Sequence, residues 1–223
     1  MKKRVGVVLS GCGFLDGSEI HEATLTLLFL DRAGAEAICL APRKNQAEVV
    51  DHETKTAVPG KTRDVLREAA RIARGRITDL ATITPSGLDA LILPGGSGAA
   101  KNLCTFASEG AAASVEPELA KLLRGMHEAR KPIGAICIAP ALVAATFRES
   151  DVHPTLTVGD DAEAGAALAA MGAEPVTAPV TGIVVDEHNR IVSTPAYMYD
   201  ARIADVAVGI ERLVGAVLSL AGA

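Results

Sequence analysis

The stretch Lys131-Pro-Ile-Gly-Ala-Ile-Cys-Ile-Ala-Pro140 decides the fold of this chain. Its short apolar run ends in Cys137 and a helix-like segment follows at once, which predicts a tight turn between a strand and a helix. A thiol at such a corner lies beside backbone N–H groups that favour its thiolate, and the thiolate is the form that attacks carbon. The position therefore predicts a nucleophile. The alternative is a small buried cysteine that packs like alanine, as free cysteines commonly do.

Around this stretch, short β-branched runs alternate with longer helical patterns. The alternation predicts an α/β fold, a flavodoxin-like three-layer sandwich with a mostly parallel sheet and helices on both faces. We expect a single domain over residues 1–223, because the sequence has no internal repeat, low-complexity linker or second core. The expected strands cover residues 5–9, 37–40, 90–93, 133–136 and 156–158, with a hairpin over 183–193; the expected helices cover 19–33, 63–73, 117–129, 139–146, 162–171 and 200–220; residues 43–60 form an excursion from the sheet and 99–114 a looser segment.

Composition and cysteine usage exclude several classes of partner. A formal net charge of −5 and the absence of tryptophan argue against a basic surface that would bind nucleic acid or an anionic membrane. A small neutral or anionic metabolite is the better candidate for a ligand. The four cysteines stand singly, which argues against a structural zinc site or a disulfide scaffold and favours a reducing, cytoplasmic location. The apolar run over residues 5–9 resembles the start of a signal peptide but is too short and lacks a cleavage pattern, so we interpret it as a strand.

Two glycine clusters resemble nucleotide-binding loops but do not match them. The dinucleotide pattern G-x-G-x-x-G requires glycine at position 16, where this chain has Asp16. The phosphate-loop pattern G-x-x-x-x-G-K-[ST] requires glycine before the lysine and a hydroxyl residue after it, but Ala100 and Asn102 flank Lys101. Glycines after a buried strand also let a backbone N–H approach a reacting oxygen closely. We therefore expect Gly95 and Gly96 to bind the substrate, with a tight turn that binds nothing as the alternative.

Glu22 is the second candidate for chemistry. It lies in the first turn of the first long helix, and the zinc pattern H-E-x-x-H fails because Leu25 occupies the second histidine position, so no metal is expected. Loops after parallel strands gather at one edge of a sheet, and this edge should bring Glu22 and Cys137 together. The alternative is a surface carboxylate that compensates the helix dipole.

Several motifs together resemble the ThiJ/PfpI superfamily of class I glutamine amidotransferase-like folds, over nearly the whole chain. Their combination is similar to the ElbB branch, an isoprenoid-biosynthesis-associated glyoxalase, whereas any one of them alone would be weak. The motifs are Ser10-Gly-Cys-Gly13, Asp16-Gly-Ser-Glu-Ile-His-Glu22, Leu93-Pro-Gly-Gly96, Gly98-Ala-Ala-Lys-Asn-Leu103, Cys137-Ile-Ala-Pro140 and Thr194-Pro-Ala-Tyr-Met198.

The resemblance implies a nucleophile elbow at Cys137, a partner acid at Glu22 and an oxyanion pocket from the N–H groups of Gly96 and Ile138. The implied activity is that of a glyoxalase: the thiolate adds to glyoxal, Glu22 relays a proton between the two carbons, and water releases a 2-hydroxy acid such as glycolate. This chemistry requires no metal, nicotinamide or glutathione. Glu22 must accept and return a proton near neutral pH, so we expect burial beside the thiol to raise its pKa.

The third catalytic partner is not fixed by the sequence. Relatives in the wider superfamily place a histidine directly after the cysteine or past the following strand, whereas this chain has Ile138 in the first place and Asp160 near the second. His153 can substitute from the preceding loop, although a surface histidine is the alternative. The chain also lacks the late His-x-Glu of glutaminases, which argues against ammonia channelling, and the missing adjacent histidine argues against a peptidase.

Two classes of function therefore remain. The first is a modest cofactor-free enzyme that acts on a small aldehyde; the second is a redox-responsive or partner-binding protein that uses the same reactive Cys137. Tyr197 and Met198 are expected either to line the pocket or to pack beneath the last helix. The apolar stripe along that helix permits a homodimer but equally serves the core.

Overall fold

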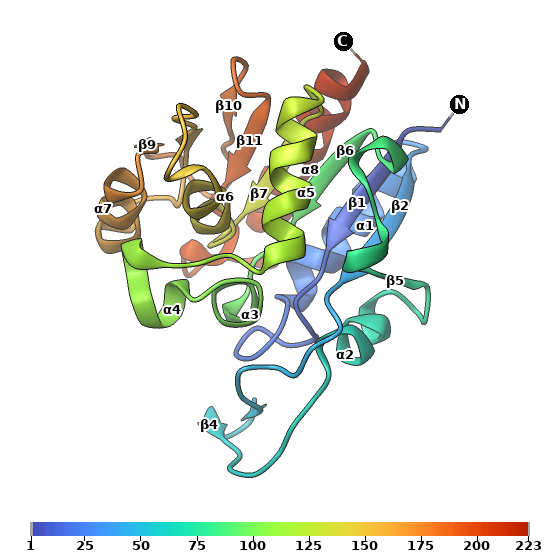
Figure 1. The fold of residues 1–223 in the computed structure, drawn as a ribbon, viewed down its shortest axis with the longest axis vertical. Helices are drawn as coiled ribbons and strands as arrows, with labels where there is room; N and C mark the ends of the chain where they lie inside the picture. The colour runs from blue at the N-terminus through green and yellow to red at the C-terminus, as the bar shows by residue number, and fades with distance from the viewer. Residues whose placement is uncertain (1, 223) are drawn as a thin grey trace.

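The computed structural model describes residues 2–222 and is built on a seven-stranded sheet in the order β10-β11-β7-β6-β1-β2-β5 (Figure 1). Neighbouring strands run parallel, except that β10 pairs antiparallel with β11. The expected α/β class with a mostly parallel sheet is confirmed. The strands of this sheet are β1 (Arg4–Val8), β2 (Glu36–Ala41), β5 (Ile77–Asp79), β6 (Ala90–Leu93), β7 (Ile133–Ile136), β10 (Val184–Asp186) and β11 (Ile191–Thr194).

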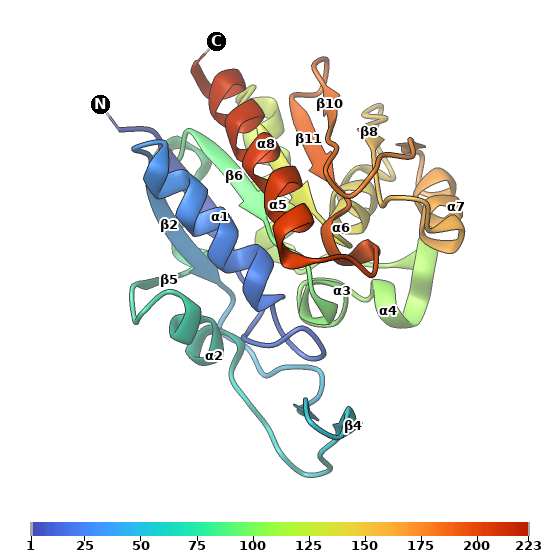
Figure 2. The same ribbon diagram turned by 180° about the vertical axis from the view of Figure 1, so that it is seen from behind.

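Helices cover both faces of the sheet. Figure 2 shows α1, α2 and α8 on one face, and Figure 1 shows α5, α6 and α7 on the other. Each face has its own buried apolar cluster, because the central strands are buried on both sides and consist of β-branched and aliphatic residues. The helices are α1 (Ile20–Arg32), α2 (Val65–Ile72), α3 (Ser97–Asn102), α4 (Phe106–Glu109), α5 (Pro117–Glu128), α6 (Pro140–Phe147), α7 (Ala162–Ala170) and α8 (Ile203–Gly222).

The sequence prediction was incomplete in two places. Residues 99–114 are not a loose segment, because they contain most of α3 and all of α4. The edge strand β5 was missed, since its three residues are too few to show a period. A further short pair, β8 (Thr155–Leu156) with β9 (Glu174–Pro175), lies outside the main sheet. The single domain expected over residues 1–223 stays a prediction, and its first and last residues lie outside the described range.

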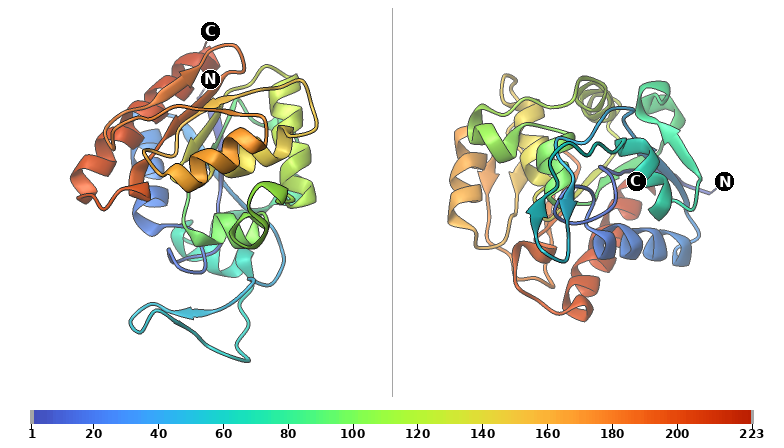
Figure 3. Two further views of the ribbon diagram at one scale, coloured as in Figure 1. Left: turned by 90° about the vertical axis from the view of Figure 1, so that its left-hand side faces the viewer. Right: turned by 90° about the horizontal axis from the view of Figure 1, so that it is seen from below.

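The excursion from the sheet expected over residues 43–60 extends over residues 43–64 and contains a small antiparallel hairpin of β3 (Val50–Asp51) and β4 (Thr56–Ala57). This excursion projects beyond the carboxyl edge of the sheet, as the left view in Figure 3 shows. No helix within residues 2–222 is long and apolar enough to span a bilayer.

One buried amide ties the excursion to the loop after β1. Asn102 Oδ1 accepts the N–H of Ala47 at 2.8 Å, while its Nδ2 donates to Ser10 O at 2.9 Å and to Asp16 O at 2.8 Å. The side chain thus joins three segments that are distant in the sequence. Because the loop after β1 leads directly into α1, Asn102 also fixes where that helix begins.

We expect Asn102→Ala to lower the free energy of unfolding by about 2–3 kcal/mol, because the substitution leaves buried backbone groups without partners. Urea denaturation followed by circular dichroism measures the loss. Thr54→Ala is the matched control, since it removes only an exposed hydrogen bond to Thr56 in the hairpin. A loss for Asn102→Ala no larger than that of the control would contradict this account of the loop.

Candidate active site

Cys137 lies immediately after β7 in a left-handed backbone conformation, with φ of +61°. A side chain rarely adopts this region, and holding it there costs about 1–3 kcal/mol. The turn is fixed by the Cys137 N–H, which donates to Thr194 O at 2.9 Å, and by the N–H of Ala139, which donates to Ile136 O at 3.0 Å. Pro140 then starts α6, where its missing N–H is not needed. This is the strand–turn–helix corner expected for a nucleophile elbow.

Glu22 lies in the first turn of α1 with a side chain that is 0% exposed. The helix begins here because the Glu19 carboxylate caps it, with Oε2 accepting the Glu22 N–H at 2.7 Å. Oε2 of Glu22 accepts the N–H of Gly95 at 2.8 Å, and Oε1 accepts the N–H of Tyr197 at 3.4 Å. The carboxyl lies beside Cys137, since a Cβ on Gly95 would meet both Glu22 Oε2 and the Cβ of Cys137, and the two groups affect each other's pKa. The structure therefore brings Glu22 and Cys137 into contact.

Gly95 permits this contact. A Cβ at position 95 would lie 2.6 Å from the Cβ of Cys137 and 2.9 Å from Glu22 Oε2, and both distances are shorter than van der Waals contact allows for a Cβ. Gly96 has φ of +92°, and a Cβ there would lie 2.3 Å from the backbone nitrogen of Glu19. The two glycines after β6 therefore let the β6 loop, the cysteine corner and the start of α1 meet.

The backbone N–H groups at the site divide between the two reactive groups. Those of Gly96 and Ile138 lie near the sulfur of Cys137 and lower the pKa of its thiol. The N–H of Gly95 instead donates to Glu22, so it holds the carboxyl and is not available to an oxyanion. Gly95 was expected to bind the substrate, but its N–H donates to the Glu22 carboxyl instead.

Burial dominates the electrostatics of the pair. It raises the pKa of Glu22 to about 8, helped by the negative charge of Glu19, and the N–H groups of Gly95 and Tyr197 offset only part of this effect. Burial and the charge of Glu22 also raise the pKa of the Cys137 thiol well above its usual range, although the N–H groups of Gly96 and Ile138 lower it. The pKa of Glu22 thus shifts in the expected direction. The sequence led us to expect a Cys137 thiolate, but the group stays protonated because burial raises its pKa more than the backbone N–H groups lower it.

The two candidates for a third partner lie away from the pair. His153 is exposed and its Nδ1 is bonded to Gly172 O at 2.9 Å, next to β8 and the turn between β10 and β11. That position is at the amino end of the parallel strands, whereas Cys137 is at the carboxyl end. Asp160 is exposed and lines a cavity over the start of α7 that does not include Cys137. Neither residue is hydrogen-bonded to Glu22 or Cys137.

Cys137 opens into a cavity of about 260 Å³. Its wall combines apolar side chains with a few polar groups, the usual composition of a small-molecule site. The residues that line it are Phe14, Glu19, Gly96, Ser97, Ala100, Lys101, Ala107, Cys137, Ile138, Tyr197 and Met198. The sequence did not decide whether Tyr197 and Met198 line the pocket or pack beneath the last helix. Their position directly after β11, whose neighbour is β7, is the signal that favours the pocket.

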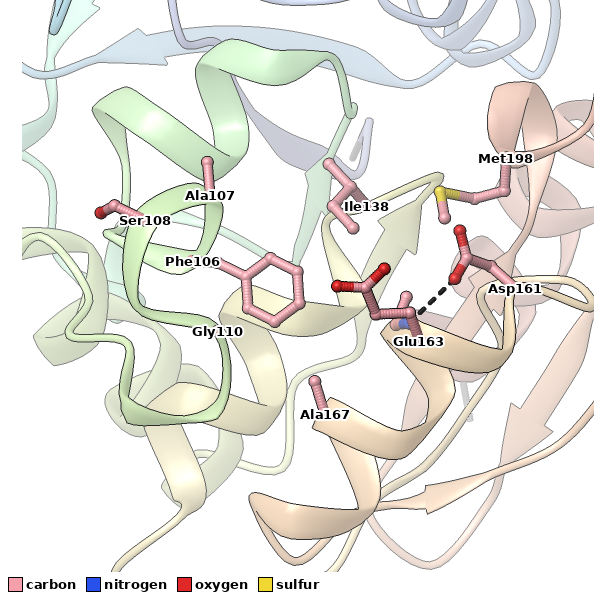
Figure 4. Close-up of a pocket in the computed structure, with 10 residues that line it drawn as sticks. Phe106, Ala107, Ser108, Gly110, Ile138, Asp161, Glu163, Ala167 and Met198 are labelled. Carbon is pink, nitrogen blue, oxygen red and sulfur yellow. Dashed lines mark hydrogen bonds between the residues drawn. The ribbon is translucent and has the colours of Figure 1, made fainter.

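A second cavity of about 400 Å³ adjoins the first and shares Ala107, Ile138 and Met198 with it. Figure 4 shows Phe106 on one side of this cavity and the carboxylates of Asp161 and Glu163 on the other. The side chain of Ile138 thus lies between the two cavities, directly after the cysteine. Within residues 2–222 no three histidine, cysteine or carboxylate side chains cluster as they would around a metal ion.

We expect Glu22→Gln to shift the alkylation of Cys137 by iodoacetamide to lower pH, by about one unit or more, because the charge that opposes the thiolate is removed. Peptide mass spectrometry over a pH series measures the rate at each cysteine. The partly exposed Cys12 is the internal control, and its rate should not change. An unchanged pH profile at Cys137 would show that the carboxyl does not govern the thiol.

Comparisons with known proteins show what this chain is similar to. No family model matches the chain. It is 44% identical over 228 residues to "Glutamine amidotransferase-like class 1 domain-containing protein 3, mitochondrial" of Homo sapiens, covering 98% of this chain and 84% of the relative. It is 43% identical over 230 residues to "ES1 protein homolog, mitochondrial" of Rattus norvegicus, covering 99% of this chain and 85% of the relative.

These relatives correct one expectation. The cytoplasmic location expected from the cysteines is contradicted, because the similar proteins from human and rat are named mitochondrial. The physical reason for the error is that unpaired cysteines indicate a reducing compartment but do not distinguish one such compartment from another.

Solved structures agree with the relatives. An isoprenoid biosynthesis protein with an amidotransferase-like domain from Ehrlichia chaffeensis superposes with a TM-score of 0.90 at 39% identity, covering 97% of this chain and 99% of the other. DJ-1beta of Drosophila melanogaster shares the fold with a TM-score of 0.57 at 20% identity, covering 100% of this chain and 97% of the other. On this evidence the chain belongs to the glutamine amidotransferase-like class 1 family, and it shares its fold with the DJ-1 structure.

Proposed function

We propose that this protein is a cofactor-independent glyoxalase-like enzyme that converts glyoxal, and related small 2-oxoaldehydes, to a 2-hydroxy acid such as glycolate. The observation that carries the proposal is that the buried Cys137 thiol and the buried Glu22 carboxyl lie side by side against Gly95. A carboxyl whose pKa is about 8 can both accept and return a proton near neutral pH. A nucleophile beside such a carboxyl supports chemistry that forms a bond to a carbonyl carbon and then moves a hydrogen.

The first step starts from the state in which Cys137 and Glu22 together hold one proton. When Glu22 is ionised and Cys137 is protonated, the sulfur attacks one aldehyde carbon while its proton passes to the Glu22 carboxylate. The new alkoxide then takes that proton from Glu22, which leaves a hemithioacetal and an ionised carboxylate. The raised pKa of the thiol does not prevent this step, because the proton leaves as the carbon–sulfur bond forms.

The second step moves hydrogen between the two carbons. The Glu22 carboxylate removes the C1 hydrogen of the hemithioacetal, which gives an enediolate, and then delivers that proton to C2. The hydroxyl proton on C1 moves to the oxygen on C2, so the product is a glycolyl thioester of Cys137 and Glu22 is again ionised. Hydrolysis of the thioester then gives glycolate and the free thiol.

Two features support the stabilisation of the negative oxygen in these steps. The N–H groups of Gly96 and Ile138 lower the pKa of the Cys137 thiol, and both residues line the same cavity as Cys137, so these groups can donate to an oxygen on the carbon that the sulfur attacks. Donors of this kind are worth about 3–4 kcal/mol each in a site that excludes water. The cavity of about 260 Å³ has room for a small aldehyde, and its apolar wall lowers the local dielectric constant.

A redox-responsive role for the same cysteine has less support. Peroxide oxidises the thiolate, and burial keeps the Cys137 thiol protonated because it raises the pKa of the group. The site therefore suits a reaction in which a neighbouring base removes the proton only when the electrophile is present.

We expect the purified protein to produce glycolate from glyoxal and lactate from methylglyoxal, at a rate that increases as the pH is raised toward about 8, because Glu22 must ionise. Cys137→Ala and Glu22→Gln should each lose at least ~100-fold in turnover. Proton NMR of the products gives the rates, and Cys39→Ala serves as a control at a buried cysteine outside the cavity. Turnover by Cys137→Ala at the parent rate would contradict the proposal.

A further inference from the structure

The proposed reaction needs a group that activates water, and this inference rests on that reaction. The glycolyl thioester must be attacked by water, which is a poor nucleophile until a base takes one of its protons. The position after the cysteine is occupied by Ile138, and His153 is at the opposite end of the strands. The site therefore requires a base from another part of the chain.

Tyr197 and His21 form a hydrogen-bonded pair at the cavity that contains Cys137. The Tyr197 hydroxyl lies 2.8 Å from Nδ1 of His21, and the two ring centres are 5.8 Å apart. Tyr197 lines the cavity together with Cys137, while His21 is on the solvent side in the first turn of α1. The pair thus connects the inside of the cavity to solvent through one hydrogen bond.

The backbone holds Tyr197 in this position. β11 ends at Thr194, beside the end of β7, and Ala196 then adopts φ of +46°, which turns the chain sharply. The N–H of Tyr197 donates to Glu22 Oε1 at 3.4 Å, so the backbone of this residue contacts the catalytic acid while its ring lines the cavity. The backbone therefore fixes the tyrosine ring at the wall of the cavity, next to the Glu22 carboxyl.

The protonation of the tyrosine is consistent with a relay. Burial and the negative charges of Glu19 and Glu22 raise the pKa of Tyr197, which keeps its hydroxyl protonated. A protonated hydroxyl can accept a proton from water only if it passes its own proton on. The Nδ1 atom of His21 is the acceptor within reach, provided that the imidazole carries its proton on Nε2.

We propose that Tyr197 and His21 together form the general base for hydrolysis of the thioester. A water proton moves to the Tyr197 oxygen while the Tyr197 proton moves to His21 Nδ1, and the resulting hydroxide adds to the thioester carbon. The carbon–sulfur bond then breaks with its electron pair on sulfur, which takes the proton of the new carboxylic acid. The imidazolium of His21 releases its proton to solvent, so the step consumes one water and no other reactant.

Tyr197→Phe tests the proposal because it keeps the ring and removes only the hydroxyl. The variant should form the adduct with glyoxal at the parent rate, but turnover should decrease by ~100-fold and the glycolyl thioester should accumulate. Acid quenching, removal of excess glyoxal by gel filtration and treatment with hydroxylamine convert the thioester to a hydroxamate that mass spectrometry detects. Tyr199→Phe is the matched control, since the hydroxyl of the other tyrosine donates to Ala178 O at 2.9 Å and should not affect turnover.

His21→Ala separates a proton relay from a packing role. His21 is exposed, so the variant leaves room for added imidazole, which should restore a large part of the lost turnover. A packing role would not be rescued in this way.

The outcomes distinguish this inference from the function on which it rests. Parent turnover in Tyr197→Phe, or a defect in adduct formation rather than in hydrolysis, would overturn the role of the tyrosine while leaving the glyoxalase proposal intact. Failure of imidazole to rescue His21→Ala would remove the histidine from the relay. A wild-type protein that forms no glycolate would overturn the proposed function itself.

Discussion

The close approach of a buried thiol and a buried carboxyl is the constraint on which the rest of the site depends. Burying the ionised form of either group is costly, so the pair retains protons that exposed groups would lose. The protein limits this cost by directing backbone N–H groups at both partners, from Gly95 to the carboxyl and from Gly96 and Ile138 to the sulfur. The result is a pair of groups close to gaining or losing one proton near neutral pH.

The architecture around the pair serves to hold two elements at contact distance. Cys137 is kept in a left-handed conformation by the ends of β7 and β11, while Glu22 is positioned by the cap at the start of α1. Neither element would reach the other if position 95 carried a side chain. The excursion over residues 43–64 contributes at a distance, because its bond to Asn102 fixes the loop that leads into α1.

Much of this arrangement could be predicted from the sequence, since it follows from rules about the edges of parallel sheets. The strand before Cys137 was predicted with its observed ends and the helix containing Glu22 to within one residue at each end, and their meeting follows from strand direction alone. The roles of individual N–H groups could not be predicted, because they depend on local turns at Gly95 and Gly96. His153 was considered as a partner because its loop precedes an expected strand, but the loop before a parallel strand lies at the amino end of the sheet, and the alternative of a surface histidine agrees with its exposure. The thiol was expected to ionise because backbone dipoles were weighed without the opposing cost of burial.

The protonation state of Glu22 tests the central claim most directly. Infrared difference spectroscopy of the wild type against Glu22→Gln, over a pH series, isolates the carbonyl stretch of a protonated carboxylic acid at this position. The account predicts that this band persists through neutral pH and is lost as the pH passes about 8. A band already absent at pH ~6, near the behaviour of an exposed glutamate, would contradict it.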